Sequence, residues 1–348
     1  MNLAHRSSAT LGSPRVVRRD ARLGTARGER GPRDPRAVLR RLRPAALAGR
    51  VGRSGFPFTA PSWPGSVPRS TPTPEVGLHY DSDWSRRYPA RLVRAMILDN
   101  VTKPVARFVA DPLVRGTDEL RGLEAPVIFA ANHASHVDAP LLLTCLPLRF
   151  RHRTAVAAAA DYFFDRRWKA HSWSLLLATF PIERAKVNRR SAELATELLA
   201  DDWNLVIFPE GGRSPDGWAQ AFRGGAAYLA VRTGRPIVPV HIDGTRHILP
   251  KGRTTVHRTK TTVTFGEPLW PEEGEDARKL GARLGSSIAV LAAEVESDWW
   301  TARRLLADER IPALQGPVAS PWRRSWQLPP DPVRADTAEP PEWPLHRR

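Results

Sequence analysis

Short apolar runs alternate with longer helical patterns along the middle of this 348-residue chain. The runs are rich in branched apolar residues and are bounded by Gly, Pro or Asp, which is typical of buried strands. The expected strands lie in the segments "APVIFAAN", "TFPIER", "NLVIFPEGG", "PIVPVHIDG" and "TTVTFGEP", and "RTAVAAAA" is either a strand or an apolar connection. Strands that alternate with helices predict an α/β fold: a single domain, at residues 115–307, with a mixed, largely parallel sheet flanked by helices.

Helices are expected between these strands, where apolar residues recur at helical spacing. The segments are "DAPLLLTCL", "DRRWKAHSWSLLLA", "SAELATELLADD" and "FRGGAAYLAVRTG". Ser191 is the expected N-cap of the third helix, and Gly234 is expected to end the fourth. A final helical segment is expected from near Glu275 to about Ala307.

A basic amphipathic segment, residues 81–114, precedes the domain, and we expect two helices there, separated near Pro104. Its apolar residues are Leu92, Val93, Met96, Ile97, Val101, Val105 and Phe108, and its basic residues are Arg86, Arg87, Arg91, Arg94, Lys103 and Arg107. The segment either packs on the domain as a helical pair or rests on anionic lipid. These two interpretations are compatible.

Both ends of the chain differ in composition from the middle. Residues 1–75 contain fifteen arginines against four acidic residues, which accounts for +11 of the net charge of +17. We expect this Arg/Pro-rich extension to be disordered, and translation could begin later, at a position such as Val67. Residues 312–348 are expected to form a Pro-rich tail. Because most of the excess charge lies in the extension, it gives only weak support for a nucleic-acid partner of the folded part.

The single cysteine, Cys145, excludes an intramolecular disulfide and a multi-cysteine zinc site, and it suits a reducing compartment. The basic N-terminus lacks the apolar core of a secretory signal. No stretch reaches the ~18 uninterrupted apolar residues of a spanning helix. We therefore expect a protein that, where it meets a membrane, lies on the surface.

Polar clusters follow three of the expected strands. They are "NHASHVD" after "VIFAA", "ER" after "TFPI", and "EGGRS" after "NLVIFP". Functional groups of α/β domains gather at the carboxyl ends of strands, so these clusters are expected to meet at one edge of the sheet.

The first cluster allows three interpretations. Asp138, five positions after His133, could orient its imidazole as a general base. Alternatively, His133, His136 and Asp138 could bind a metal ion, although no fourth ligand or helical histidine pair supports that site. The third interpretation is a polar turn at the end of a strand. Spacing favours the dyad over the metal and leaves the turn open, and we predict no metal and no cofactor.

The second and third clusters contain Arg184, Arg213 and the pair Gly211 and Gly212. Glycines let the backbone approach a ligand, and a guanidinium can bind a phosphate with two hydrogen bonds. Together they indicate an anionic group on the substrate, although each arginine alone could be a surface charge. The chain has no nucleotide-binding glycine motif of the P-loop or dinucleotide type and no G-x-S-x-G nucleophile motif.

Taken in order, "NHASHVD", "FPIER", "FPEGGRS" and "PIVPV" resemble the four sequence blocks of the glycerolipid acyltransferase family, typified by bacterial 1-acylglycerol-3-phosphate acyltransferases. The resemblance covers about residues 120 to 245. It departs from the commonest pattern at Gly212, where threonine is frequent, and at Glu183, where aspartate is frequent. These two departures bear on the acceptor more than on the chemistry.

The resemblance implies that His133 is the general base, that Asp138 orients it, and that the acceptor hydroxyl attacks an acyl thioester without a covalent acyl-enzyme. It also implies a substrate-binding set composed of Asn132, Arg184, Glu210, Gly211, Gly212 and Arg213. The fourth block, around Pro239, is expected to shape the acyl site. Residues 81–114 resemble the membrane-docking helices of relatives.

We therefore expect transfer of a fatty acyl chain from acyl-CoA or acyl carrier protein to 1-acylglycerol-3-phosphate. The expected partners are the two substrates, a membrane surface and, as a candidate donor, acyl carrier protein; nucleic acid is disfavoured. The expected location is the cytoplasm, at the inner face of the cell membrane. The alternatives are another lyso-lipid acceptor, such as an aminolipid or glycolipid, or a non-enzymatic basic module that binds membrane or nucleic acid.

Overall fold

A computed structural model of the protein describes residues 77–183, 189–249, 255–316, 323–324 and 328. The predicted extension at residues 1–75 lies outside the described residues, as does most of the predicted tail. Arg184 is also outside them.

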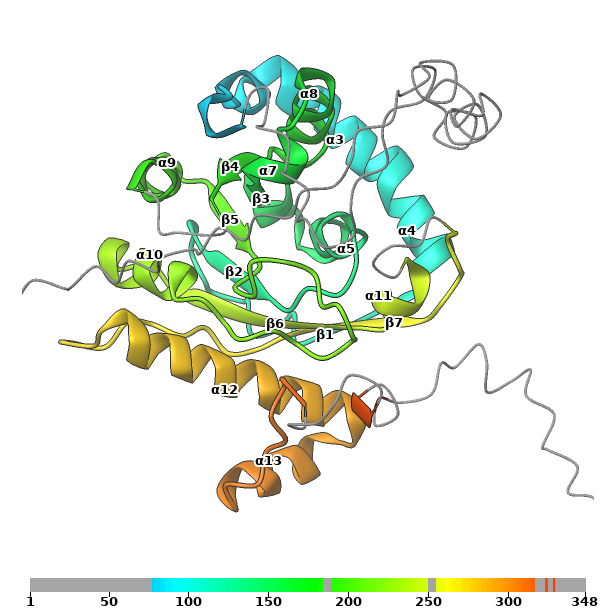
Figure 1. The fold of residues 1–348 in the computed structure, drawn as a ribbon, viewed down its shortest axis with the longest axis vertical. Helices are drawn as coiled ribbons and strands as arrows, with labels where there is room; N and C mark the ends of the chain where they lie inside the picture. Colours follow the sequence, from blue (N-terminus) through cyan, green and yellow to red (C-terminus); the bar gives the residue numbers. More distant parts are fainter. Residues whose placement is uncertain (1–76, 184–188, 250–254, 317–322, 325–327, 329–348) are drawn as a thin grey trace, which may run out of the picture. The chain divides into compact units, whose positions relative to one another are not determined.

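Among the described residues, seven strands form one sheet in the order β1-β7-β6-β2-β5-β3-β4 (Figure 1). They are β1 (Pro112–Arg115), β2 (Ile128–Ala131), β3 (Thr154–Ala159), β4 (Phe180–Ile182), β5 (Asn204–Ile207), β6 (Ile237–Asp243) and β7 (Thr261–Phe265). All neighbouring strands are parallel except β6 and β7, which are antiparallel. The prediction of a mixed, largely parallel sheet flanked by helices is confirmed.

Strand β1 was not among the expected strands, because its residues were assigned to the helical segment 81–114. It is an edge strand paired with β7. It is only four residues long and is half-buried, so it offers neither a buried apolar run nor a long alternation. Pro112 at its start is compatible with an edge position, where no partner requires its missing N–H.

The two expected N-terminal helices are present, but they are not separated at Pro104. Helix α3 (Tyr88–Ile97) continues through a π-helical turn at Leu98–Thr102 into α4 (Lys103–Ala110). Pro104 lies in the first turn of α4, a position that tolerates proline. In the wider π-helical turn before it, the Lys103 N–H donates to the Leu98 carbonyl, so the helical run continues although Pro104 has no N–H to donate.

The remaining helices follow the strands in alternation. The longer ones are α5 (Asp138–Cys145), α8 (Arg167–Leu177), α9 (Arg189–Ala200), α10 (Gly225–Thr233), α12 (Ala277–Glu296) and α13 (Trp299–Ala307). The short ones are two 3-10 turns (Gly77–His79 and Asp83–Arg86) and the single turns α6 (Leu148–Arg151), α7 (Ala160–Phe163) and α11 (Thr245–Ile248).

Three helix boundaries bear on the predictions. Helix α9 begins at Arg189, so Ser191 lies inside its first turn and is not its N-cap. The final helical segment is divided into α12 and α13, because Asp298 caps a new helix by accepting the Thr301 N–H at 3.0 Å. Gly234 ends α10 in the left-handed conformation, as expected.

Two apolar clusters cover the two faces of the sheet. On one face, residues of β2, β6 and β7 pack with α5 and with part of α4, and on the other face residues of β2, β3 and β5 pack with α9, α10 and α12. Figure 1 shows α4 and α5 on one side of the sheet and α12 on the other. Strands β2 and β5 lie inside the sheet with every residue buried. This rigid centre positions the loops that follow both strands.

Most of the apolar residues predicted in the segment 81–114 do not pack into the core. Six of them remain widely exposed: Leu92, Val93, Met96, Val101, Val105 and Phe108. Arg94, expected on the basic face, is instead only 2% exposed and donates a hydrogen bond to the Ser85 carbonyl at 2.8 Å. Burial lowers the pKa of Arg94 to about 10. The helical run α3–α4 thus presents an apolar stripe outward and uses Arg94 for attachment.

Candidate functional site

The loop between β2 and α5 brings His133 onto Asp138. The Nδ1 atom of His133 lies 2.8 Å from Oδ2 of Asp138. An ionised carboxylate accepts hydrogen bonds only, so this contact places the proton of the neutral ring on Nδ1 and leaves Nε2 as an acceptor. Nε2 has no hydrogen-bond partner among the described residues. The ring can therefore take a proton from a hydroxyl.

The backbone around Asp138 holds the carboxylate in place. Its Oδ2 atom also accepts the N–H groups of Ala134 at 2.7 Å and Ser135 at 2.8 Å, and the side chain is fully buried. Asp138 is the first residue of α5, where the helix dipole favours negative charge. The loop folds back because the small residues 134 and 135 let their amides converge on one oxygen.

His133 lies on one wall of a cavity of about 900 Å³. Its ring stacks on Phe208, with the ring centroids 4.2 Å apart and the planes at 24°. The cavity is also lined by Gly211, Gly212 and Arg213. The loops after β2 and β5 therefore meet, as expected, at one edge of the sheet, and they do so around an accessible imidazole.

Glu210 was predicted to bind substrate. In the structure it is buried, and its carboxylate accepts hydrogen bonds from the protein backbone. Its Oε1 atom accepts the His133 N–H at 2.7 Å, and Oε2 accepts the Gln220 N–H at 2.8 Å. Burial raises the pKa of Glu210 to about 7, although these two backbone hydrogen bonds favour its ionised form. The side chain therefore positions the main chain of His133 and Gln220.

Replacing Glu210 with glutamine is expected to change how stability depends on pH. Folding raises the pKa of this carboxyl from 4.5 to about 7, so the folded state binds the proton more tightly and gains stability as the pH falls through that range. From pH ~8 to ~5, the free energy of unfolding of the wild type should rise by about 2 kcal/mol relative to Glu210→Gln. Urea denaturation at several pH values measures this difference. Parallel curves for the two proteins would contradict the assignment.

Asn132 also uses its side chain inside the protein. Its Nδ2 atom donates to the Ile242 carbonyl at 2.9 Å, and its Oδ1 atom accepts the Ile242 N–H at 2.7 Å. This pair of hydrogen bonds joins the end of β2 to the end of β6, the strand that contains Pro239. Asn132 therefore fixes where the His133 loop leaves the sheet.

Gly211 and Gly212 bring bare backbone to the cavity wall. Gly211 has a φ of +71°, which disfavours a side chain, and a Cβ atom there would stand 2.7 Å from Nε of Arg223. Arg213 lies beside them on the same wall. Arg184, the other predicted cation of the set, lies outside the described residues.

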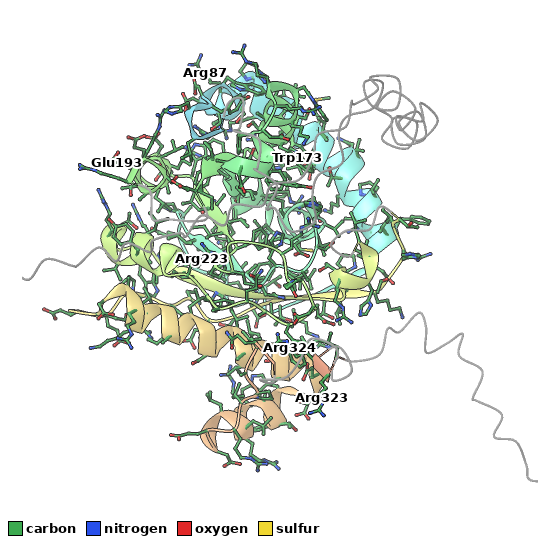
Figure 2. All side chains as sticks on the ribbon, in the orientation of Figure 1. Arg87, Trp173, Glu193, Arg223, Arg323 and Arg324 are labelled. Carbon is green, nitrogen blue, oxygen red and sulfur yellow. The ribbon has the colours of Figure 1, made fainter. Side chains whose placement is uncertain are left out.

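Three residues of the site were not identified from the sequence. Arg223, labelled in Figure 2, lines the cavity from the loop before α10. Gln220 bridges the carbonyls of Gly212 and Arg213 at 2.9 and 3.0 Å. Phe208 supplies the ring under His133. The sequence did contain a signal for Arg223. Like Arg213, it lies next to a pair of glycines, here Gly224 and Gly225 at the start of a helix.

His136 lines the same cavity as His133, but its contacts are with Tyr162. Its Nε2 atom lies 3.0 Å from the Tyr162 hydroxyl, and the two rings stack with centroids 5.4 Å apart. Burial, together with the charge of Arg213, lowers the pKa of His136 to about 4. No group of three metal-binding side chains is found among the residues that the structure describes. His136 is thus a neutral ring stacked on Tyr162.

A second cavity, of about 530 Å³, adjoins the first and shares Ile182, Phe208 and Arg223 with it. Its walls are mostly apolar and come from β3, β4, β5, α9 and α10, with Phe180, Ala195 and Leu229 among them. An apolar space therefore opens beside a cavity whose lining includes three histidines, two arginines and two acidic residues.

The fold and the site define an α/β domain with a histidine–aspartate pair, a cavity lined by Arg213 and Arg223, and an adjoining apolar cavity. Residues 111–243 match the family model described as Acyltransferase. This part of the chain, which contains all four sequence blocks, is similar to that family.

Similar proteins with curated names include two 1-acyl-sn-glycerol-3-phosphate acyltransferases. The chloroplastic one from Brassica napus is 27% identical over 167 residues, 47% of this chain and 46% of its own. The one from Chlamydomonas reinhardtii is 28% identical over 167 residues, 46% of this chain and 47% of its own. The chain spans about half the length of these curated relatives.

A solved structure is also similar, namely the crystal structure of the 1-acyl-sn-glycerophosphate acyltransferase PlsC from Thermotoga maritima. It is 26% identical in sequence, covers 62% of this chain and 84% of its own, and has a TM-score of 0.47.

Proposed function

We propose that the protein transfers a fatty acyl chain from an acyl thioester to the free hydroxyl of 1-acylglycerol-3-phosphate. The observation that carries the proposal is the 2.8 Å contact between His133 and Asp138, with the other ring nitrogen available to the cavity. The names of the relatives support the choice of acceptor. The sequence match through the third block supports the same chemistry.

In the proposed reaction, Nε2 of His133 takes the proton of the acceptor hydroxyl as its oxygen attacks the thioester carbonyl carbon. A C–O bond forms, the tetrahedral intermediate collapses, and the C–S bond breaks. The leaving thiolate then takes the proton from the imidazolium, so the products are an ester and a free thiol. Asp138 keeps the Nδ1–H in place and stabilises the transient positive charge. No acyl group becomes attached to the protein.

The cationic wall is the proposed site of the acceptor phosphate. Arg213 and Arg223 line the cavity that His133 faces, and a guanidinium binds a phosphate through two parallel hydrogen bonds. The backbone at Gly211 and Gly212 can approach the same group closely. We assign Arg184 to this set as well, from its place in the second block.

The adjoining apolar cavity is the proposed site of an acyl chain. Its walls have few polar atoms, as hydrocarbon requires, and it opens next to Phe208 beneath the His133 ring. The donor thioester is either acyl-CoA or acyl carrier protein. Both place the same carbonyl at the dyad.

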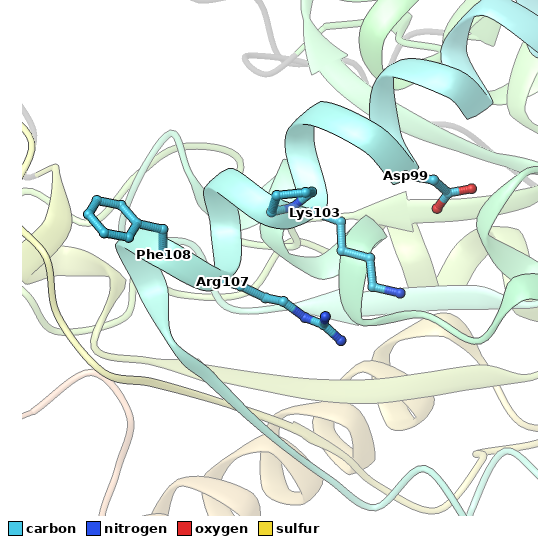
Figure 3. Close-up of a pocket in the computed structure, with 5 residues that line it drawn as sticks. Asp99, Lys103, Arg107 and Phe108 are labelled. Carbon is cyan, nitrogen blue, oxygen red and sulfur yellow. The ribbon is translucent and has the colours of Figure 1, made fainter.

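The exposed stripe on α3–α4 is the proposed membrane contact, since both the acceptor and the product belong in a bilayer. Figure 3 shows Lys103 and Arg107 extending from the same side of α4, with Phe108 on another side, around a shallow pocket of about 530 Å³. Asp99 in this pocket is held by Arg151 at 2.7 Å and His152 at 3.2 Å. The two cations can therefore meet anionic headgroups while the apolar stripe enters the interface.

No helix among the described residues is long and apolar enough to cross a bilayer. We propose peripheral attachment, with the cytoplasmic face of the cell membrane as the site of action.

Replacing Met96 and Phe108 together with serine should weaken binding to anionic vesicles by about tenfold or more, because each apolar side chain contributes ~1.5 kcal/mol or more when removed from water. Vesicle flotation with phosphatidylglycerol membranes measures the partition. Trp300→Ser is the matched control, because Trp300 is even more exposed than Met96 and Phe108 but lies on α13. Loss of binding in the control alone, or unchanged binding in the double variant, would rule out the stripe as the contact.

The proposed function is tested by thiol release from oleoyl-CoA in the presence of three acceptors: 1-acylglycerol-3-phosphate, lysophosphatidylcholine and monoacylglycerol. We expect release to depend on acceptor and to be fastest with 1-acylglycerol-3-phosphate, by about tenfold or more over monoacylglycerol, because charge-assisted hydrogen bonds contribute ~1.5–3 kcal/mol. A preference for another lyso-lipid would move the proposal to that acceptor. A rate of thiol release that is the same with and without each of the three acceptors would overturn the proposal.

A further inference from the structure

The C-terminal segment, here residues 310–316 and 323–324, returns to the loop that follows β5. That loop, residues 208–224, contains the third sequence block and has no helix or strand of its own. Sequence composition assigned everything after residue 312 to a tail. The described part of this tail instead makes four specific contacts with the loop.

An ion pair forms the first of these contacts. Nε of Arg324 lies 2.7 Å from Oδ2 of Asp216, although the two residues are 108 positions apart. Both side chains are about three-quarters buried, with 22% and 23% exposed, so the pair is less screened than one on the open surface. Although burial opposes ionisation, the hydrogen bond from Arg324 holds the pKa of Asp216 below its usual range.

Backbone and ring contacts extend the attachment. The indole N–H of Trp218 donates to the Arg324 carbonyl at 2.9 Å, and the Ala219 N–H donates to the Leu314 carbonyl at 3.0 Å. Gly316 lies so close to the Trp218 ring that a Cβ atom there would overlap it. The loop is therefore held at residues 216, 218 and 219 by a segment distant in sequence.

The C-terminal segment is itself anchored to the folded domain. Ile311 packs against the cluster formed by α12 and α13, and Leu314 packs against the cluster beneath the sheet. A flexible appendage would gain no position from its contacts with a loop. Because this segment is itself packed on the core, its contacts fix residues 216–219 relative to the core.

The other side of the same loop holds the dyad. The Ser214 N–H donates to the His133 carbonyl at 2.9 Å, and the Gln220 N–H donates to Glu210, which also accepts the His133 N–H. Gln220 further fixes the carbonyls of Gly212 and Arg213. Residues 214–220 therefore contact the C-terminal segment at 216, 218 and 219, and the His133 loop and the cavity wall at 214 and 220.

We propose that Arg324 and Asp216 are positioning residues for the acceptor: through Trp218 and Gln220 they hold the Gly212–Arg213 backbone, and with it the Arg213 side chain, at the place where the acceptor phosphate binds. This inference rests on the proposed function. It predicts that the pair determines the affinity for the phosphorylated acceptor and leaves the donor site and the dyad largely unaffected.

The test uses the full chain as wild type, Arg324→Ala, Asp216→Ala and the double variant, with acyl transfer followed by thiol release. Each single variant should raise the KM for 1-acylglycerol-3-phosphate by about three- to tenfold, the range expected within one hydrogen-bond network. The KM for oleoyl-CoA and kcat should change little. Asp216 also accepts the Trp218 N–H at 3.2 Å, so Asp216→Ala removes the ion pair and this contact, and the double variant should be no worse than Asp216→Ala.

Arg310→Ala is the matched control. Arg310 belongs to the same segment and is exposed, and its side chain has no hydrogen bond or ion pair to any residue that the structure describes. A loss of stability alone would lower the amount of active enzyme and leave the KM unchanged. An unchanged acceptor KM, or additive effects in the double variant, would overturn the proposal.

Hydrogen exchange separates this inference from the proposed function. If the wild type shows no acceptor-dependent thiol release, the proposed function fails, and amide exchange of residues 216–220 still reports the attachment. Exchange at Trp218, Ala219 and Gln220 should be faster in Arg324→Ala than in the wild type or in Arg310→Ala. Equal exchange in all three proteins would overturn the attachment itself.

Discussion

Replacing His133 with alanine should reduce acyl transfer by about 10²–10⁴-fold, the contribution usually made by a positioned general base. The loss should fall on kcat, because in the proposed reaction the ring takes the hydroxyl proton in the transition state and other residues hold the acceptor phosphate. Steady-state thiol release from oleoyl-CoA with 1-acylglycerol-3-phosphate measures it. The main-chain hydrogen bonds to Glu210 and Ser214 persist in the variant, so the loop should keep its conformation.

The informative control for this variant is His136→Gln. His136 lies three residues further along the same loop, but it is stacked on Tyr162 and is not in contact with Asp138. It should retain most of the activity. If the two histidine variants lost activity equally, the assignment of the base to His133 would be wrong.

Replacing Asp138 with asparagine should be nearly as damaging, for a reason that the three hydrogen bonds to one oxygen make specific. The asparagine oxygen should take the place of Oδ2, because there it can still accept the amides of Ala134 and Ser135 and the Nδ1–H of His133. The ring would keep its tautomer, but the negative charge that stabilises the imidazolium in the transition state would be lost, and the NH₂ group would be buried at the place of Oδ1. We expect kcat to fall by about 10²–10⁴-fold with a smaller change in KM.

Asp165→Asn provides the matched control for this second variant. Asp165 forms an ion pair with Lys169 at 2.7 Å on α8 and its loop, and both side chains are about one-third exposed. Its removal should leave kcat unchanged. Thermal unfolding of both variants measures stability in parallel, and a loss of activity in Asp138→Asn that only follows a loss of folded protein would contradict the proposed role of the carboxylate charge.

The sequence was informative where a function depends on local spacing. His133 and Asp138 are five residues apart, so one tight loop brings them together, and the strand before them was a clear apolar run. The alternation of strands and helices likewise predicted the sheet and the edge at which the polar clusters meet. In each case the deciding contacts lie within one loop or follow from the order of elements.

Contacts between distant residues were not accessible in the same way. Glu210 reaches His133 across 77 residues and Asn132 reaches Ile242 across 110, so neither positioning role leaves a local pattern. The composition of the C-terminal segment suggested a tail, because a segment rich in Pro and Trp without hydrophobic periodicity predicts neither a helix nor a strand. Its contacts with Asp216 and Trp218 arise only once the loop after β5 has been placed by the sheet.

The apolar stripe on α3–α4 shows a further limit of pattern. Helical spacing predicts an amphipathic helix but does not say whether its apolar face meets protein or lipid. In the structure Met96 and Phe108 are 58% and 67% exposed, while Arg94 is buried against Ser85. The exposed fraction of these side chains cannot be obtained from the periodicity of the sequence. It favours the interpretation that the stripe contacts lipid over packing on the domain.

The central claim is that this protein forms a diacyl product by general-base catalysis at His133, and mass spectrometry of the lipid product tests it most directly. With oleoyl-CoA and 1-acylglycerol-3-phosphate, the wild type should form one molecule of diacylglycerol phosphate for each thiol released, and His133→Ala should form almost none. Thiol release without the diacyl product, or equal product from both proteins, would contradict the account.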